Sequence, residues 1–590
     1  MTADPTGFRR RSVFQAAGLA ALGATLAACD DERQGPKSDT FIYAYPYSYE
    51  DASYNTFLGK DAFLDQAAVT ELLRPSLAML NWETYQWTGL VIEDHAWDGD
   101  TLHLALRSGV NWSSGDRLSA KDVLGTFQVE RINADANTPG WSDVKKVEAL
   151  SETEVAVTFH QTYYGVETEI LRSRVSPYAV YHEWMDRAAA LLEDGVEHGD
   201  DEQVAFDEEL TALAPPQEDF LAYGPYKLDA ASEEDVDLVL NDGGLFSDRV
   251  GFARCRAVNA DNSEATRLLL QQEIDYMTQV LDSAKRDILY EVEGITETNT
   301  PGNDGVGLMF NYGDDPAFDD VRLRKALLHV LDREYIGEDA LGGGGFSLPH
   351  YDCGLPDRHA EEIYSTEELA EMPRYDTDQG KARELLEEIG WSLSPDGWKD
   401  DSGEPVSYTV VAPAGWSDFE AVGKQVADQL STFGIRCEYE AIDGGNPWGV
   451  WNAGDFQIAV RHWGNPTVPY HYGSWAMTWF TDNERTDASP GMDYDTTEVE
   501  TDTMGTVEID GLYEKARKGS EEERVEANKE LGRIFHETLP RLPLVLMNRV
   551  TYGIEDLRAN TLDTGEYAAN DIYTDNPVML RMLQGDIGPA

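Results

Sequence analysis

The sequence predicts a mixed α/β protein with more than one domain. The chain has 590 residues, which exceeds what a single hydrophobic core normally supports. Residues 41–45 and 101–107 show the aromatic or alternating patterns of β-strands. Residues 119–127 are typical of a helix start, with Ser119 as the N-cap and an acidic residue in the first turn. We therefore expect two or three domains that combine strands and helices.

The charge balance is strongly acidic. There are 110 acidic and 46 basic residues, which gives a formal net charge of −64 at pH 7. Phosphate binding needs basic patches, so this composition argues against nucleic acid as a partner. Such a charge destabilises a compact state unless salt screens it, and the Debye length falls to about 3 Å at 1 M salt. The acids are dispersed and the bases are mostly Arg, which favours a salt-accumulating halophile over an ordinary acidic protein.

The N-terminus has the organisation of an export signal. Residues 8–29 contain a basic start, an apolar stretch and a small-residue cleavage region. The apolar part is too short and too rich in Ala and Gly for a confident membrane span, which needs about 20 strongly apolar residues. The run from Arg9 to Phe14 resembles a twin-arginine signal. We therefore expect residues 1–28 to be removed after export by the twin-arginine route.

The end of this signal resembles a lipobox. Leu26-Ala27-Ala28-Cys29 has the expected order of residues, with cleavage before the cysteine and lipid attached to its thiol. Residues 29–40 are polar and lack apolar periodicity, so we expect a flexible tether between membrane and domain. The predicted location is the extracytoplasmic face of the cell membrane.

Cysteine is scarce in the rest of the chain. The other three are Cys255, Cys353 and Cys437, and no pair has CxxC spacing. A zinc site or a disulfide framework is therefore not supported. With Cys29 lipidated, at most one disulfide could form, and the sequence leaves open whether any two pair.

One stretch resembles a family signature. Residues 106–123 read LRSGVNWSSGDRLSAKDV, which is similar to the strand, turn and helix pattern LR-x-GV-x-W-x-x-G-x-x-L-x-A-x-DV of family-5 solute-binding proteins of ABC importers, the dipeptide/oligopeptide type. Further matches follow in the family's order at residues 223–228, 265–275, 310–311, 318–334, 375–391 and 454–464. The resemblance covers about residues 40 to 560.

This resemblance implies a periplasmic-binding-protein-like fold. It has two lobes with mixed sheets, hinge strands that cross between them twice, and the extra subdomain of large members. The expected boundaries are 41–80 with 215–295 and 540–590 for the lobe I core, 81–214 for the extra subdomain, and 296–539 for lobe II. Hinge closure would enclose a ligand, and the closed form would be recognised by the permease.

The function implied is that of a receptor. A monomer would capture a small oligomeric solute, most simply a di- or oligopeptide, and deliver it to an ABC permease with its ATPase subunits. Most signature residues are expected to be structural: Gly115 and Gly224 at turns that need a permissive backbone, and Arg322 and Arg324 on a helix, in ion pairs with nearby acids.

Residues 443–480 are unusually aromatic. Flat rings can pack against apolar or sugar faces while an N–H or O–H group forms hydrogen bonds. Trp463 is the strongest candidate for ligand contact, because it ends a predicted strand and precedes the loop signal Gly464-Asn465-Pro466. For each of the other rings, a position in the hydrophobic core is expected at least as much as a position in the site. The ligand contacts predicted here are Trp448, Trp463, Asn465, Tyr470 and Trp475.

Two further candidates follow predicted strands. Asn311 comes after the apolar residues 306–310, and it either hydrogen-bonds the ligand or caps the turn. Trp416 comes after the strand at 408–411, where family relatives place a pocket loop, and a core position is equally expected.

The segment after Trp463 departs from the family pattern. In many peptide-binding relatives an aspartate follows within a few residues and pairs with the peptide's α-amino group. Residues 463–470 contain no acid, and Asn465 supplies no charge. This absence weakens the peptide assignment and leaves oligosaccharides as the alternative.

Patterns typical of enzymes are incomplete. Residues 415–419 lack the second glycine of a nucleophile elbow. His182 and His536 precede Glu but have no second histidine four positions on. Residues 342–345 are glycines, but Phe346 follows where a phosphate loop has Lys. We therefore predict a binding protein without catalytic residues, cofactor or metal, with an exported hydrolase as the alternative.

The anchor prediction is tested by Cys29→Ala. Removing the thiol removes the lipid attachment point, so the protein should move from the membrane fraction to the medium, as measured by cell fractionation and immunoblotting. Cys255→Ala is the control and should remain in the membrane fraction. Retention of the Cys29→Ala protein at the membrane would contradict the lipid anchor.

Overall fold

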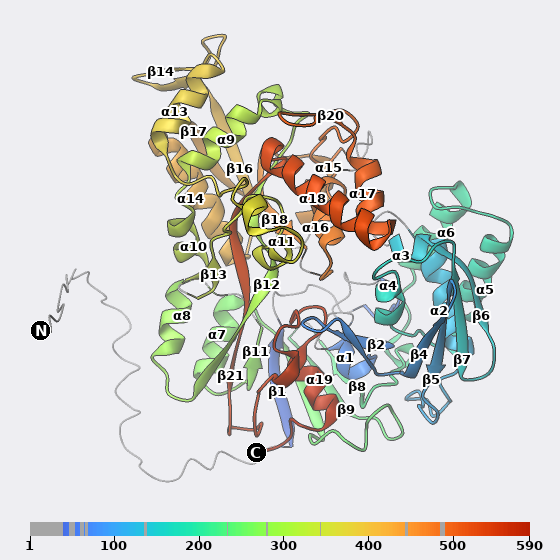
Figure 1. Cartoon of the computed structure of the whole chain (residues 1–590). Coiled ribbons are helices and arrows are strands. Elements are labelled where there is room, and N and C mark those ends of the chain that lie inside the picture. Colours follow the sequence, from blue (N-terminus) through green and yellow to red (C-terminus); the bar gives the residue numbers. More distant parts are fainter. Residues whose placement is uncertain are drawn as a thin grey trace, which may run out of the picture.

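The computed structural model describes residues 39–45, 53–58, 64, 69–134, 139–232, 234–278, 281, 283–342, 344–442, 447–465, 467–483 and 490–590. The predicted signal, Cys29 and nearly all of the tether lie outside these ranges. The expected α/β architecture is confirmed, with two lobes connected by long strands (Figure 1).

One mixed sheet runs through both lobes. Within the described residues it has eleven strands. In spatial order they are β17 (Arg436–Ile442), β16 (Ser407–Pro413), β18 (Ile458–Gly464), β12 (Ile295–Phe310), β21 (Arg541–Ile554), β11 (Tyr276–Met277), β1 (Thr40–Tyr45), β10 (Arg254–Asn259), β9 (Asp235–Leu240) and β8 (Tyr226–Ala231), with β13 (Phe346–Ser347) also paired to β21. We call the part built on β1 and β8–β11 lobe I, and the part built on β16–β18 lobe II.

Helices cover the sheet in both lobes (Figure 1). Those of lobe I are α1 (Thr70–Leu73), α7 (Asn262–Leu270), α8 (Ser283–Tyr290) and α19 (Pro577–Gln584). Those of lobe II are α9 (Val321–Val330), α10 (Arg333–Leu341), α11 (Asp357–Ile363), α12 (Thr366–Leu369), α13 (Gln379–Glu388), α14 (Ser417–Phe433), α15 (Pro447–Ala453), α16 (His471–Trp479), α17 (Ile509–Lys518) and α18 (Glu521–Thr538). Two hairpins complete it: β14 (Ser392–Ser394) with β15 (Gly397–Lys399), and β19 (Val499–Thr501) with β20 (Gly505–Val507).

A second group of elements lies to one side of lobe I, at the right of Figure 1. Its strands are β2 (Ala78–Asn81), β3 (Gln86–Gly89), β4 (Ile92–Asp98), β5 (Thr101–Leu106), β6 (Val144–Ala149) and β7 (Glu154–Phe159). Its helices are α2 (Ala120–Ile132), α3 (Pro139–Ser142), α4 (Glu167–Arg172), α5 (Tyr178–Glu193) and α6 (Asp201–Thr211). We call this group the side subdomain; the exact domain boundaries given above stay predictions.

Local sequence signals explain several of these elements. Ser119 and Asp122 form a capping box at the start of α2, as the sequence predicts. Along α14 the buried side chains recur at helical spacing and pack against β16 and β17, and the helix ends at Gly434 in the left-handed conformation. Arg322 pairs with Asp320 at 2.6 Å as expected.

Two structural expectations need correction. The guanidinium of Arg324 is buried and donates to the main-chain carbonyls of Thr538 and Leu539 rather than pairing with a carboxylate. Gly224 has no positive φ; a Cβ there would lie 2.3 Å from the carbonyl oxygen of Leu72. Its role is therefore close approach of two backbone segments rather than the conformation of a turn.

The two lobes have separate hydrophobic cores. One cluster of buried residues contains lobe II, from Val306 to Met547. Another contains part of lobe I together with part of the side subdomain, from Phe41 to Ile587, and a third packs α7 and α8 of lobe I. Each lobe can therefore move as a unit, and the strands β12 and β21 connect the two.

The hinge ladder between β12 and β21 has two register shifts, one between Pro301 and Gly305 and a second between Val306 and Gly307. Pro301 pairs with Asn548 and Gly305 with Leu546, so residues 302–304 of β12 face a single residue of β21. Such a bulge bends and twists a strand locally. Beyond it, Gly305 lies so close to β21 that a Cβ would be 1.9 Å from the Val545 carbonyl oxygen.

We therefore expect Gly305→Ala to lower the free energy of unfolding by about 3 kcal/mol. The added Cβ would clash with a backbone carbonyl, which cannot move aside as the end of a flexible side chain can. Gly588→Ala is the matched control: the nearest atom to the added Cβ, the Cα of Gly251, is 3.8 Å away, and we expect a change within about 0.5 kcal/mol. Denaturant unfolding in molar salt measures both. Equal stability of the two variants would contradict the close approach.

Candidate functional site

The carboxyl ends of parallel strands from both lobes meet at one place. In lobe I, β1 runs parallel to β10 and β11; in lobe II, β16 runs parallel to β17 and β18. The Asn262 side-chain amide at the start of α7 donates to the Ser417 hydroxyl at the start of α14, at 3.0 Å. Ligands of open α/β sheets bind outside the carboxyl ends of strands. We call this region, where α7, α14 and the end of β18 meet, the interlobe junction.

An aromatic group lies beside the junction. The ring of Trp416 makes edge contacts with Phe419, Trp448 and Trp451, at centroid distances of 5.4, 5.8 and 6.2 Å. Trp451 is fully buried, whereas Trp448 is 47% exposed. Of these four rings, Trp448 therefore offers the largest free surface to a ligand.

Trp463 is part of the scaffold at the hinge. Its indole is 1% exposed and donates its N–H to the Val545 carbonyl at 3.0 Å. The ring also lies over the hinge-strand glycines Gly305 and Gly307, where a Cβ would come within 2.4 and 3.2 Å of it. Trp463 thus connects β18 to both hinge strands, with its one polar group satisfied.

The two predicted asparagines cap turns. The Asn465 carbonyl oxygen accepts from the main-chain N–H groups of Thr467 and Val468, both at 2.9 Å, and its amide donates to the Gly473 carbonyl. The Asn311 side chain accepts from Gly313 and donates to Gly454. Of the alternatives for Asn311, capping is the role that its contacts show.

Tyr470 and Trp475 lie away from the junction. Trp475 is fully buried in lobe II and donates its N–H to the Asn528 side chain at 2.7 Å. Tyr470 is 4% exposed and packs against rings of the side subdomain. The structure therefore brings Trp416 and Trp448 together at the junction. Trp463 and Asn465 lie at the end of β18, and Asn311, Tyr470 and Trp475 lie elsewhere. The ligand contacts of all seven residues stay predictions.

A buried charge network joins the hinge to β18. Asp304, in the bulge of β12, pairs with Arg549 of β21, which also pairs with Asp571 at 2.8 Å. The His462 ring nitrogen lies 2.9 Å from the second Asp304 oxygen. Burial raises the pKa of Asp304 but Arg549 and His462 outweigh it, so the pKa falls below its ordinary value. Burial dominates for the other two groups, raising the pKa of Asp571 and lowering that of His462.

Two buried carboxylates that the sequence did not indicate lie on elements that pack against β18. Asp304 stands opposite Gly464 in the β12–β18 register. Asp418 is fully buried in the first turn of α14, next to the Ser417 that bonds to lobe I. No local signal marks either residue, because strand register and helix placement decide both positions.

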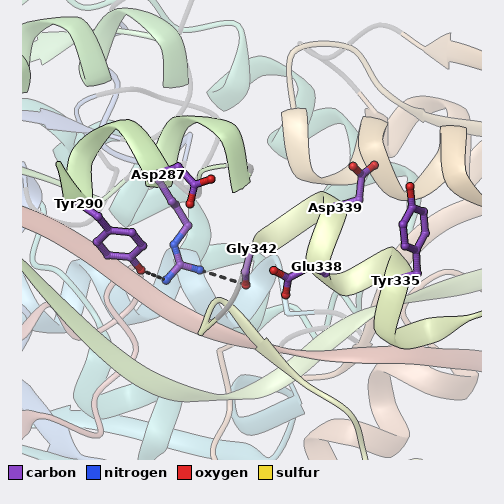
Figure 2. Close-up of a pocket in the computed structure, with 7 residues that line it drawn as sticks. Asp287, Tyr290, Tyr335, Glu338, Asp339 and Gly342 are labelled. Carbon is purple, nitrogen blue, oxygen red and sulfur yellow. Dashed lines mark hydrogen bonds between the residues drawn. The ribbon is translucent and has the colours of Figure 1, made fainter. Parts of the chain in front are cut away.

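A separate cavity lies between α8 of lobe I and α10 of lobe II (Figure 2). Its volume is about 340 Å³, and Asp287, Tyr290, Tyr335, Glu338, Asp339 and Gly342 are among its lining residues. None of the predicted ligand residues lines it. The buried guanidinium of Arg286 is bonded there to the Leu341 carbonyl and to Tyr290.

The described part of the chain also bears on metal sites, thiols and membrane spans. It contains no group of three or more His, Cys, Asp or Glu side chains that could hold a metal ion. Cys255, Cys353 and Cys437 are free and buried there, and burial raises the pKa of each thiol to about 12. In the same ranges, no helix is both long and apolar enough to cross a membrane.

The family model described as Bacterial extracellular solute-binding proteins, family 5 Middle, matches residues 77–484, well over half of the chain. The chain belongs to this family. Among curated proteins, this family-5 protein is similar to the oligopeptide-binding protein AppA of Bacillus subtilis, with 27% identity over 165 residues, which is 26% of this chain and 28% of that protein.

Solved structures share the fold. The mannohexaose-bound periplasmic oligopeptide-binding protein of Thermotoga maritima is 18% identical, with a TM-score of 0.76 over 94% of this chain and 99% of that chain. AppA of Bacillus subtilis with a nonapeptide is 16% identical, with a TM-score of 0.68 over 94% and 100%. These likenesses confirm the two-lobed periplasmic-binding fold for this family-5 protein.

We expect Arg549→Leu to destabilise the fold by about 3–5 kcal/mol, because it leaves the carboxylates of Asp304 and Asp571 buried without their cation. The control is Arg254→Leu, which breaks an exposed pair with Asp229 and should cost under about 1 kcal/mol. Urea unfolding of both variants in molar salt provides the comparison. A small effect at Arg549 would contradict its part in holding the hinge.

Proposed function

We propose that this chain is an extracytoplasmic receptor that captures a short oligopeptide between its lobes and delivers it to an ABC import permease. The observation that carries the proposal is the family match across residues 77–484 together with the junction at which both sets of strand ends meet. A ligand in contact with both lobes stabilises the closed form, and the permease with its ATPase subunits would respond to that form.

The peptide assignment is supported by relatives and by charge. AppA of Bacillus subtilis is named for oligopeptides and has been solved with a nonapeptide. The loop after Trp463 carries no acid, but Asp304 stands opposite Gly464 and brings a buried carboxylate close to it. A cationic amino terminus bound here would therefore find negative charge from β12.

An oligosaccharide is the second candidate. The Thermotoga maritima protein was solved with mannohexaose, and the half-exposed ring of Trp448 suits the face of a sugar. In both cases we assign ligand contact to Trp448 and Trp416. We assign Trp463, Asn465 and Asn311 to shaping the surrounding loops.

The remaining features of the proposal concern location and class. We propose twin-arginine export, a lipid on Cys29, a monomeric state and a halophilic source, as expected from the sequence. The family consists of binding proteins, and we propose that this chain has no catalytic activity, cofactor or metal. The expected domain boundaries given above complete the proposal.

Titration calorimetry of the mature chain in molar salt tests the ligand class. We expect stoichiometric binding of tri- to pentapeptides without turnover, and affinity about tenfold lower in Trp448→Ala, because aromatic contacts contribute about 1 kcal/mol beyond their buried area. Trp97→Ala is the control, since Trp97 is also exposed, at 40%, but lies on β4. Binding of mannose oligomers alone would favour the sugar candidate, and product formation would favour a hydrolase.

A further inference from the structure

The lobes meet at a second place, where a lobe II tyrosine enters the side subdomain. Tyr470, the N-cap residue of α16, stacks on Tyr85 at 5.8 Å between centroids and meets Tyr164 edge-on at 4.9 Å. Its hydroxyl accepts a hydrogen bond from Thr168 of α4 at 3.3 Å. A side chain of lobe II is thus buried by three residues of the opposite lobe.

The space for this ring depends on one glycine. Gly165 lies between Tyr164 and α4 with φ +82°, and a Cβ there would be 2.7 Å from the nearest carbon of the Tyr470 ring. The ring packs directly against the backbone at this notch. Because the notch belongs to the side subdomain and the ring to lobe II, the contact exists only when the lobes are together.

Cations of lobe II surround the ring contact. Arg517 and Lys518, at the end of α17, pair with Asp143 at 3.2 and 2.8 Å, and Arg517 also donates to the Tyr163 hydroxyl. Arg524 lies over the Tyr164 ring, 4.7 Å from its centroid. Arg358 of α11 donates to the Trp82 carbonyl and to the Tyr85 hydroxyl.

One cation of the side subdomain also contacts lobe II. Arg172, at the end of α4, donates to the Thr467 carbonyl at 2.6 Å and pairs with Asp575 at 2.5 Å. Thr467 belongs to the turn that Asn465 caps. The loop following β18 is thereby attached to lobe I without any ligand atom.

The charge at this contact is unusual for the chain. With 110 acidic and 46 basic residues, most surfaces brought together would repel each other. Here the basic side chains of one lobe meet carbonyls, phenols and Asp143 of the other. Partly buried pairs are also screened by salt less than exposed ones.

We propose that Tyr470 and the Gly165 notch, with the surrounding cations, form a latch that holds a fraction of the molecules closed in the absence of ligand. Tyr470 is then a positioning residue: it raises ligand affinity by populating the closed form, a role that differs from the direct ligand contact expected from the sequence. The link to affinity rests on the proposed receptor function, whereas the latch itself concerns only lobe closure.

The test measures closure directly, without a ligand. Spin labels are attached through Ser151→Cys in the side subdomain and Glu522→Cys in α18, both exposed positions, in the full mature chain carrying Cys29→Ala. The native thiols at Cys255, Cys353 and Cys437 are buried. Double electron–electron resonance in molar salt then reports the distance distribution between the lobes.

Gly165→Ala should lower the ratio of closed to open molecules by at least about fivefold, because the new methyl group clashes with the ring. Gly195→Ala is the matched control: it also has positive φ, +78°, but no atom within 4 Å of the added Cβ. Backbone strain alone would affect both variants equally. In a Tyr470→Ala background, which itself favours the open form, Gly165→Ala should have no further effect.

Three outcomes would overturn the latch: a wild-type distribution that lacks the closed distance, equal behaviour of the Gly165→Ala and Gly195→Ala variants, or an undiminished effect of Gly165→Ala in the Tyr470→Ala background. A failure of the receptor function is distinguishable, since it would appear as absent peptide and sugar binding in calorimetry while the distance distributions still follow the predicted order. Circular dichroism confirms that each variant is folded.

Discussion

The close pairing of β12 with β21 is the constraint on which the rest of the structure depends. These strands belong to both lobes, and their approach is possible only because Gly305 and Gly307 leave room for the Val545 and Leu542 carbonyls and for the Trp463 ring. Trp463 in turn holds β18 against the pair. The position of the loop after β18, and hence one side of the interlobe junction, follows from that packing.

Basic residues are few, and several of them lie in the interior. Arg549 pairs with Asp304 and Asp571 at the hinge, Arg541 and Arg461 share Asp482, and Arg333 pairs with Asp352, all with little or no exposure. A buried carboxylate needs such a partner far more than an exposed one does. Because these basic residues lie in the interior, the surface is more acidic. Such a surface fits a protein in a solvent with enough salt to screen the repulsion between like charges.

Local signals in the sequence predicted local structure well. The cap at Ser119, the strand at 41–45 and the order of the family's motifs all correspond to elements of the two-lobed fold. The individual site residues were harder to predict, because an aromatic residue at a strand end has the same local pattern whether it faces a ligand or the hinge. Trp463 and Trp448 differ in exposure only through tertiary packing, and Asp304 reaches Gly464 only through strand register.

The bulge at residues 302–304 has a mechanical consequence. A two-stranded ribbon twists readily about its long axis but resists stretching, since its hydrogen bonds and covalent backbone keep their lengths. Because both register shifts fall within the short stretch 302–307, we expect the lobes to behave as rigid bodies related by a single angle at constant separation. An enclosed solute must then fit a gap of constant height between the lobes. Solutes with side chains of different bulk would be accommodated by displacing different amounts of water from this gap, and the gap itself would not widen.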